Sequence, residues 1–187
     1  MDHPYPSLSE AFVRYAARFP REPDVVRFHD WLRGEPRPFH RETLAGHFTG
    51  SAWLVSADGE RVLLMHHRKL QRWLQLGGHA DGEADLSSVA LREAEEESGL
   101  VDLEVLPDIF DVDLHRIPAR RDEPEHWHYD VRYVVIARGS EAFTVNEESL
   151  ALAWRPVAEL AADPAADPSL RRMAAKWLAS HQPTPPP

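Results

Sequence analysis

Apolar residues recur at helical spacing in two segments near the start of the chain. The first opens on a Ser-x-x-Glu capping box and stops at Pro20, and the second ends at Gly34, a residue that favours the position after a helix. The pattern predicts helices over residues 8–19 and 24–33. We interpret residues 1–44 as an N-terminal helical extension.

The pattern then changes to β-forming residues. Residues 48–55 and 61–67 are rich in such residues, and Asp58-Gly59 between them is typical of a tight hairpin turn. We therefore predict a β-hairpin. Residues 73–79, which include two adjacent glycines, are expected to form a loop.

Helical spacing returns over residues 85–98, and Gly99 follows at a position suited to ending the helix. A short helical turn is expected at residues 156–160. A last helix over residues 167–180 begins with an Asp-Pro pair, which suits a cap and a first turn. Three further strands are predicted, over residues 101–106, 109–115 and 127–137.

The length and composition indicate one folded domain. Of the 187 residues, 43% are hydrophobic and 28% are charged, and no long linker divides the chain. We predict a domain over residues 45–181 and a disordered tail over residues 182–187. No apolar run approaches the ~18 residues of a membrane-spanning helix, and the start does not resemble a signal peptide, so we expect a cytoplasmic protein without a membrane partner.

Cysteine content and charge exclude several classes of function. The chain has no cysteine, which excludes disulfide frameworks, thiolate metal sites and cysteine nucleophiles. Its net charge is -10, so its average field would repel a nucleic-acid backbone. We expect no stable nucleic-acid binding, and a polyanionic ligand would need metal ions or a local basic pocket.

Three glutamates of the predicted helix over residues 85–98 are spaced to act together. Glu93, Glu96 and Glu97 follow the i, i+3, i+4 pattern, so their side chains fall within one arc of the helix. Their mutual repulsion would be relieved by a divalent cation with oxygen ligands, such as Mg²⁺. Gly77 and Gly78, just before this helix, allow the backbone to approach a ligand closely.

Residues 78–100 resemble the Nudix box, G-x5-E-x7-R-E-U-x-E-E-x-G-U, in which U is a bulky apolar residue. Ala94 is a small occupant of the first U position. The chain departs from the box at Ala84, where the box has its first Glu, and Glu83 stands one place earlier. The residues that match are Gly78, Arg92, Glu93, Glu96, Glu97, Gly99 and Leu100.

The resemblance implies an α/β fold in which a mixed β-sheet is sandwiched between helices, an α/β/α sandwich. It implies a MutT-like, metal-dependent hydrolase that cleaves a diphosphate linkage in a nucleoside diphosphate-linked compound by water attack at phosphorus. The box glutamates would hold Mg²⁺ or Mn²⁺, which also supplies the positive field that the protein lacks. The implied metal site is Glu93, Glu96, Glu97 and Gly78, with Arg92 as a further catalytic residue.

Two predicted strands carry a row of polar residues. Alternation places Asp111, Asp113 and His115 on one face of the first strand, and a second polar set on one face of the next. This row suits a solvated face, a substrate-contacting wall or a second metal site, and the sequence leaves these open. With His79 as an anion contact, the candidate substrate-binding residues are Gly77, Gly78, His79, His126, His128, Asp130 and Arg132.

An acidic segment offers a general base. Related enzymes often carry a further glutamate here, on a loop that reaches the metals, which points to Glu147 and Glu148. A metal-bound glutamate is a weaker base, because the cation stabilises its ionised form. Glu93, a histidine of residues 126–128, and a merely exposed acidic turn remain as alternatives.

A different class of function is a catalytically weak, Nudix-like module that binds a nucleotide as a sensor. The repulsive glutamate cluster favours the enzyme, since a pure binder has no need of it. Isomerisation on the same fold relies on a catalytic cysteine, which this chain lacks. The sequence leaves open the particular nucleotide or diphosphate substrate, and whether the N-terminal helices cover a sheet edge or form a homodimer contact.

Overall fold

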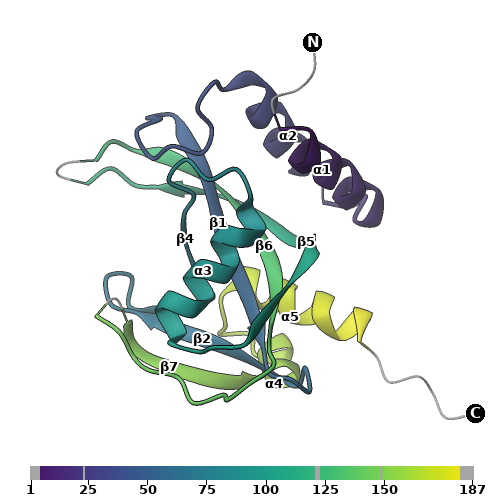
Figure 1. The fold of residues 1–187 in the computed structure, drawn as a ribbon, viewed down its shortest axis with the longest axis vertical. Coiled ribbons are helices and arrows are strands. Elements are labelled where there is room, and N and C mark those ends of the chain that lie inside the picture. Colours follow the sequence, from purple (N-terminus) through teal and green to yellow (C-terminus); the bar gives the residue numbers. More distant parts are fainter. Residues whose placement is uncertain (1–4, 23, 121–122, 148, 182–187) are drawn as a thin grey trace, which may run out of the picture.

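The computed structural model describes residues 5–22, 24–120, 123–147 and 149–181. The helices are α1 (Pro6–Arg18), α2 (Val25–Gly34), α3 (Leu86–Ser98), α4 (Val157–Ala162) and α5 (Pro168–Ser180). The strands are β1 (Gly46–Val55), β2 (Arg61–His67), β3 (Arg72–Leu74), β4 (Leu76–His79), β5 (Leu103–Ile117), β6 (His126–Ala137) and β7 (Ser149–Pro156). Figure 1 shows these elements, and the predicted tail over residues 182–187 lies outside the described part.

β1 lies at the centre of the mixed sheet. It runs parallel to β6 on one edge and antiparallel to β4 on the other. Every residue of β1 is buried, as expected for a central strand covered on both faces. The sheet order is β3-β2-β1-β6-β5, with β4 paired to β1 and β7 paired to β2.

The predicted hairpin forms at its turn, where β1 and β2 pair through Val55 and Val62. Beyond this point the two strands diverge, because β4 occupies the edge of β1, while β2 pairs with β3 and β7. The loop prediction for residues 73–79 is wrong, since this segment contributes β3 and β4. Its glycines gave little β-strand signal, and the pairing with β1 overrides that weak propensity.

The two strands predicted over residues 101–106 and 109–115 form one strand, β5, paired with β6. The register shifts on either side of Ile109. Pro107 lies in the irregular stretch and lacks the N–H that a regular ladder requires, which accounts for the local break in the pattern. β7 was not predicted, and it completes the sheet beyond β2.

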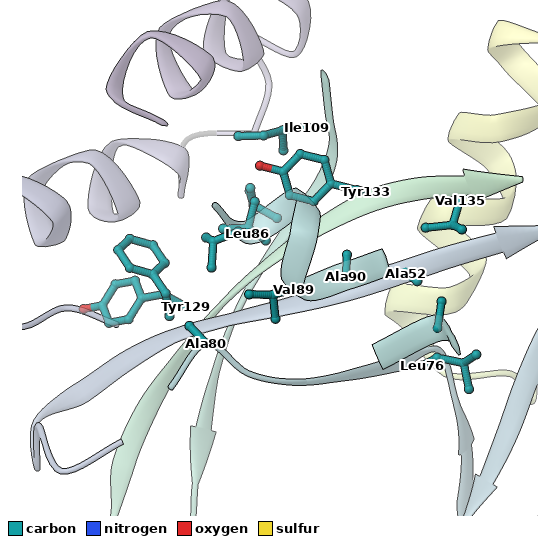
Figure 2. Close-up of a cluster of buried hydrophobic side chains, with 14 of the residues drawn as sticks. Ala52, Leu76, Ala80, Leu86, Val89, Ala90, Ile109, Tyr129, Tyr133 and Val135 are labelled. Atoms are coloured by element: carbon teal, nitrogen blue, oxygen red, sulfur yellow. The ribbon is translucent and has the colours of Figure 1, made fainter. Parts of the chain in front are cut away.

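α3 packs on one face of the sheet and begins and ends as the sequence predicts. The Asp85 side chain caps its first turn, and Gly99 ends it in the left-handed conformation with φ 69°. Figure 2 shows Leu86, Val89 and Ala90 of α3 within the hydrophobic cluster on this face. A Cβ at Gly50 of β1 would lie 2.8 Å from the Val89 side chain, so this glycine allows close packing.

α4 and α5 cover the opposite face of the sheet. There, Trp53 and Val55 of β1 belong to a second hydrophobic cluster with Met173 and Trp177 of α5. Because neighbouring β1 residues belong to the cluster under α3, the two clusters lie on the two faces of one sheet. The α/β/α sandwich prediction is therefore confirmed.

α1 and α2 pack against the same core as the sheet. Phe12 of α1 and Phe28 of α2 are buried, and both contact the Phe48 ring of β1. The predicted capping box does not form: α1 begins at Pro6, which places Ser7 inside the first turn. Within the described residues, none of the helices combines the length and apolarity required to span a membrane.

Candidate functional site

The predicted glutamate helix lies directly over the glycine pair of β4. The Glu97 side chain is buried and accepts a hydrogen bond from the Gly77 backbone N–H at 2.8 Å. A Cβ built at Gly78 would come within 2.5 Å of a Glu93 carboxylate oxygen, so glycine provides the space that this carboxylate occupies. Glu96 lies on the exposed side of α3. The structure thus brings Glu93 and Glu97 together with the glycine backbone.

Arg92 holds one carboxylate of this cluster. Its guanidinium pairs with Glu93 at 3.0 Å and donates to the His79 carbonyl at 3.2 Å. It therefore joins α3 to the end of β4. Glu83, the residue one place before the box's first Glu position, instead accepts a hydrogen bond from the Asp85 backbone at 2.8 Å, at the start of α3.

The donor set of this cluster fits a hard divalent cation. Glu93, Glu96 and Glu97 offer carboxylate oxygens, and Gly78, whose backbone lies close to the Glu93 carboxylate, carries a carbonyl oxygen as well. Mg²⁺ and Mn²⁺ prefer such oxygen ligands to nitrogen or sulfur. The Glu93 carboxylate occupies the space that a Cβ at Gly78 would fill, so the absence of a side chain at Gly78 lets this carboxylate lie against the backbone.

The polar row on β5 and β6 is buried at its centre. Asp111 is 0% exposed, and it pairs with Arg132 of β6 at 3.2 Å. α5 contributes two further cations, since Arg172 and Lys176 lie 2.8 and 2.7 Å from Asp111. These four residues form what we call the Asp111 network. The solvated-face interpretation is wrong for this part of the row, and the sequence did not reveal that α5 supplies the countercharges.

Asp130 joins the same network from the side of β1. It pairs with Arg132 at 2.7 Å and accepts hydrogen bonds from the Thr49 and Ser51 hydroxyls at 2.9 and 2.7 Å. Both Asp130 and Arg132 are 2% exposed. Their charges are therefore paired within the protein, and their proposed contact with substrate stays a prediction.

Asp113 lies at the edge of the network and is less buried. Burial acts to raise its pKa, but the hydrogen bond with His115 and the charges of Arg132 and Arg172 outweigh it. The pKa of Asp113 is therefore well below its ordinary value. Asp113 stays ionised under all but strongly acidic conditions.

Histidines gather at the other end of the same face. The ring of His47 lies 5.1, 5.0 and 4.9 Å from the rings of His79, His126 and His128, measured between centroids. The parallel pairing of β1 with β6 sets His47 opposite His128. His126 and His128 were predicted to share a face, whereas His47 was missed because its partner strand lies some 80 residues away in sequence.

Burial controls the charge of these imidazoles. Burial lowers the pKa of His47 to about 4, with the neighbouring His79 and His126 adding to the shift and the Thr43 backbone opposing it. Burial likewise lowers the pKa of His128 to about 2, and that of His79 in the same direction. These rings are neutral near pH 7.

The segment carrying the candidate base approaches the end of α3. Thr144 donates its backbone N–H to the Ser98 carbonyl at 2.7 Å, and Arg68 donates to the Glu147 carbonyl at 2.9 Å. The Glu147 side chain is exposed. Glu148 lies outside the described residues, so the base assignment stays a prediction.

A comparison with protein-family models supports the resemblance of residues 78–100 to the Nudix box. The model of the NUDIX domain matches residues 47–177. No curated protein matches this chain. The match begins at β1 and ends in α5, and it therefore spans both faces of the sheet and the glutamate helix.

Solved structures share the fold. The MutT protein of Methanosarcina mazei Go1 is 14% identical, with 75% of this chain and 99% of that chain covered and a TM-score of 0.56. A Caenorhabditis elegans Ap4A hydrolase complex is 18% identical, with 72% of this chain and 98% of that chain covered and a TM-score of 0.54. The Escherichia coli dihydroneopterin triphosphate pyrophosphohydrolase is 16% identical, with 72% of this chain and 96% of that chain covered and a TM-score of 0.56.

At these identities, the structural similarity shows the fold alone. The domain match covers well over half of the chain and includes the residues that carry the box, from Gly78 to Leu100. The structure adds the glutamate helix seated over its glycine pair. The chain belongs to the Nudix hydrolase family.

Proposed function

We propose that the chain is a Mg²⁺- or Mn²⁺-dependent pyrophosphohydrolase that cleaves a diphosphate linkage in a small nucleoside diphosphate-linked compound. Family membership supports hydrolysis of phosphorus anhydrides in general. The observation that carries the proposal is the convergence of Glu93 and Glu97 on the backbone of Gly77 and Gly78. In this reaction the oxygen of water forms a new bond to one phosphorus of the diphosphate, and the P–O bond between that phosphorus and the bridging oxygen breaks.

In this mechanism, Glu93, Glu96, Glu97 and the Gly78 carbonyl would hold the cation. Bound there, it would supply positive charge for the diphosphate and lower the pKa of the attacking water. Arg92 positions the Glu93 carboxylate through their 3.0 Å pair, and it is itself fixed to the His79 carbonyl. The hydrogen bond from the Gly77 N–H restricts the orientation of the buried Glu97 carboxylate.

The general base in this proposal is Glu147 or Glu148. A loop carboxylate outside the cation's ligands keeps a higher pKa than a ligating one, and it can approach the water as substrate binds. The bond between Thr144 and Ser98 supports this role, because it ties the loop to the end of the glutamate helix. Glu93 and the histidines of residues 126–128 remain the other candidates.

The experiment is a substrate panel in ¹⁸O-labelled water with Mg²⁺ or Mn²⁺. It includes nucleoside triphosphates, ADP-ribose, nucleotide sugars, a dinucleoside tetraphosphate and dihydroneopterin triphosphate, the last two suggested by the names of the structural relatives. We expect one substrate class to turn over with the label in a phosphate product. Saturable nucleotide binding with no turnover of any compound would instead favour the sensor.

A further inference from the structure

A second cluster of potential ligands lies outside the glutamate site. His47 of β1 and His126 and His128 of β6 each offer a ring nitrogen, and these three atoms lie within 4.8 Å of one another. We call these three residues the imidazole triad. They come from two parallel neighbouring strands, so the sheet itself fixes their spacing.

His47 points to a ligand at this place. It is 1% exposed, and within the part of the chain that the structure describes neither of its ring nitrogens makes a hydrogen bond of regular distance and angle, although the Thr43 backbone lies close enough to act on its charge. Buried polar atoms in folded proteins are nearly always satisfied, so an unpartnered one requires an explanation. The ring lies beside those of His126 and His128, and a shared ligand would satisfy it.

His126 is oriented as a metal ligand usually is. Its Nδ1 lies 2.9 Å from the Pro124 carbonyl, which can only accept, so Nδ1 carries the proton and donates it. In the neutral ring the lone pair is then on Nε2, which lies 3.1 Å from Nε2 of His128 and 3.7 Å from the Glu123 carboxylate. A backbone carbonyl that accepts from the distal nitrogen is the typical outer partner of a metal-bound histidine.

The spacing and the donor type select the kind of ion. Zinc with bonds of ~2.0–2.1 Å to nitrogen and tetrahedral geometry separates its ligand atoms by about 3.3 Å, close to the separation of His126 and His128. All three ligand atoms lie within 4.8 Å of one another, so no separation has to shorten by more than about 1.5 Å to reach this spacing. Neutral imidazoles suit Zn²⁺ and related transition metals, whereas Mg²⁺ prefers oxygen.

The buried carboxylates near the triad are paired with cationic side chains. Asp130 and Asp111 are paired with arginine and lysine side chains, and Asp113 is paired with Arg132 and Arg172. The half-exposed Glu123 carboxylate lies 3.7 Å from Nε2 of His126, at the outer side of the triad. Three protein nitrogens would leave a fourth position open, as in zinc sites that accept water or another small ligand. His79 and His115 have rings next to His128 and border this position.

We propose that the imidazole triad binds one Zn²⁺ ion, at a site separate from the glutamate site of the proposed function. The two sites differ in donor chemistry, nitrogen here and oxygen there. They also differ in position, since the triad lies on the face of the sheet opposite to the one that α3 covers.

The test titrates Zn²⁺ into chelator-treated full-length protein in millimolar Mg²⁺, which keeps the glutamate site occupied. We expect one equivalent bound by calorimetry, a higher melting temperature, and an intense tetrahedral absorption spectrum when Co²⁺ replaces Zn²⁺. None of these readouts depends on turnover. A failure of the hydrolase proposal would therefore leave this one standing, and the reverse also holds.

The variants are His47→Leu and His128→Asn, with His66→Asn as the matched control on β2. Because loss of an outer partner typically costs 10–100-fold in metal affinity, loss of a ligand is expected to cost more than about 100-fold. His47→Leu removes two unpartnered buried nitrogens, so its metal-free melting temperature should be equal to or above that of the wild type. His66 lies outside the triad, beside Trp73, and its variant should bind Zn²⁺ normally.

The proposal is overturned if Zn²⁺ does not bind saturably or if the two triad variants bind it as the wild type does. It is equally overturned if only Glu97→Gln abolishes binding, since the ion would then occupy the glutamate site. If His47→Leu fails to fold, His128→Asn decides the outcome through the same Co²⁺ spectrum.

Discussion

Two groups of carboxylates lie on the two sides of the sheet, and their surroundings differ. On the α5 side, Asp111 is 0% exposed and meets the cations of Arg132, Arg172 and Lys176. On the α3 side, Glu93 pairs with Arg92, and its neighbour Glu97 accepts from a backbone N–H. The Asp111 network carries its own countercharges, whereas the glutamate helix concentrates like charges on one stripe.

This difference separates a structural role from a functional one. A buried carboxylate that joins β5, β6 and α5 crosslinks the fold, and removing it takes one carboxylate partner from each of the three cations around it, two of which are buried. Like charges gathered on one helix face raise the energy of the folded protein, and a cation from solution lowers it again. The first group should therefore control stability, and the second should control turnover and metal response.

The largest expected effect is that of Asp111→Asn on stability. This substitution leaves Arg132, Arg172 and Lys176 without their shared partner, and we expect a loss of about 3–5 kcal/mol in the free energy of unfolding. Urea denaturation measures it. The control is Asp108→Asn, because Asp108 is 57% exposed in its pairs with Arg14 and Arg18. This substitution should cost less than about 0.5 kcal/mol in the free energy of unfolding. Equal losses of unfolding free energy for both substitutions would show that the Asp111 network does not stabilise the fold more than an exposed ion pair does.

The pH dependence of stability should show two separate windows. His47 has a pKa of about 4 in the folded protein against an ordinary 6.5, so between these values the unfolded chain binds a proton that the folded protein does not. In chelator, His47 should thus lower the free energy of unfolding by up to about 1.4 kcal/mol per pH unit as the pH drops from 6.5 to 4, and His128 and His79 add to this loss because their pKa values are also lowered. His47→Leu should remove its own share and make this limb less steep.

Asp113 should control the lower window. Its pKa in the folded protein is below the ordinary 3.8, so its stabilising contribution is complete above pH 3.8 and is lost as the pH falls further. The difference in unfolding free energy between the wild type and Asp113→Asn should shrink below this pH. A constant difference from pH 7 to pH 3 would mean that Asp113 does not stabilise the fold through its charge.

Magnesium should raise the melting temperature through the glutamates and not through the Asp111 network. A cation at 100 times its dissociation constant stabilises the folded state by about 2.7 kcal/mol, or roughly 5–10 °C for a chain of this size. Thermal scans with and without Mg²⁺ measure the shift. Glu97→Gln should abolish it, whereas Asp113→Asn and the exposed Glu95→Gln should retain it. A shift that Glu97→Gln leaves intact would place the cation elsewhere.

The smallest expected effect is that of Gly78→Ala. Its methyl group would meet the Glu93 carboxylate at 2.5 Å and displace this side chain, while the fold is kept because the obstacle is the end of a flexible side chain. We expect a roughly 10-fold lower kcat, about 1.4 kcal/mol, at an unchanged melting temperature. Gly34→Ala is the control, since no atom lies within 4 Å of its added Cβ. Normal turnover by Gly78→Ala would show that the Glu93 position is not critical.

The glutamate helix could be predicted because its information is local. Asp85, Gly99 and the spacing of the glutamates all lie within one segment, and the Nudix box covers the same segment. The glycine pair was predicted to approach a ligand, although its place in a strand beside β1 was not predicted. β4 is recognisable only from its pairing with β1, which a local pattern does not contain.

The opposite face could not be predicted in the same way. Alternation placed Asp111 and Arg132 on faces of their own strands, but whether that face was exposed depended on α5, some 60 residues later. His47 joins His128 only through the parallel pairing of β1 with β6. Such contacts between distant segments follow from topology, and residue type alone indicates only which side chains are available for them.

The most direct test of the central claim compares kcat for Glu93→Gln and Glu97→Gln with that for Glu95→Gln, an exposed neighbour on the same helix. Glutamine keeps the side-chain shape and the oxygen that accepts from Gly77, so metal-free melting temperatures should stay close to the wild type. We predict that kcat falls by about 100-fold or more in the first two variants and is unchanged in the third. Wild-type turnover in Glu93→Gln and Glu97→Gln would contradict the assignment of the glutamate helix as the catalytic metal site.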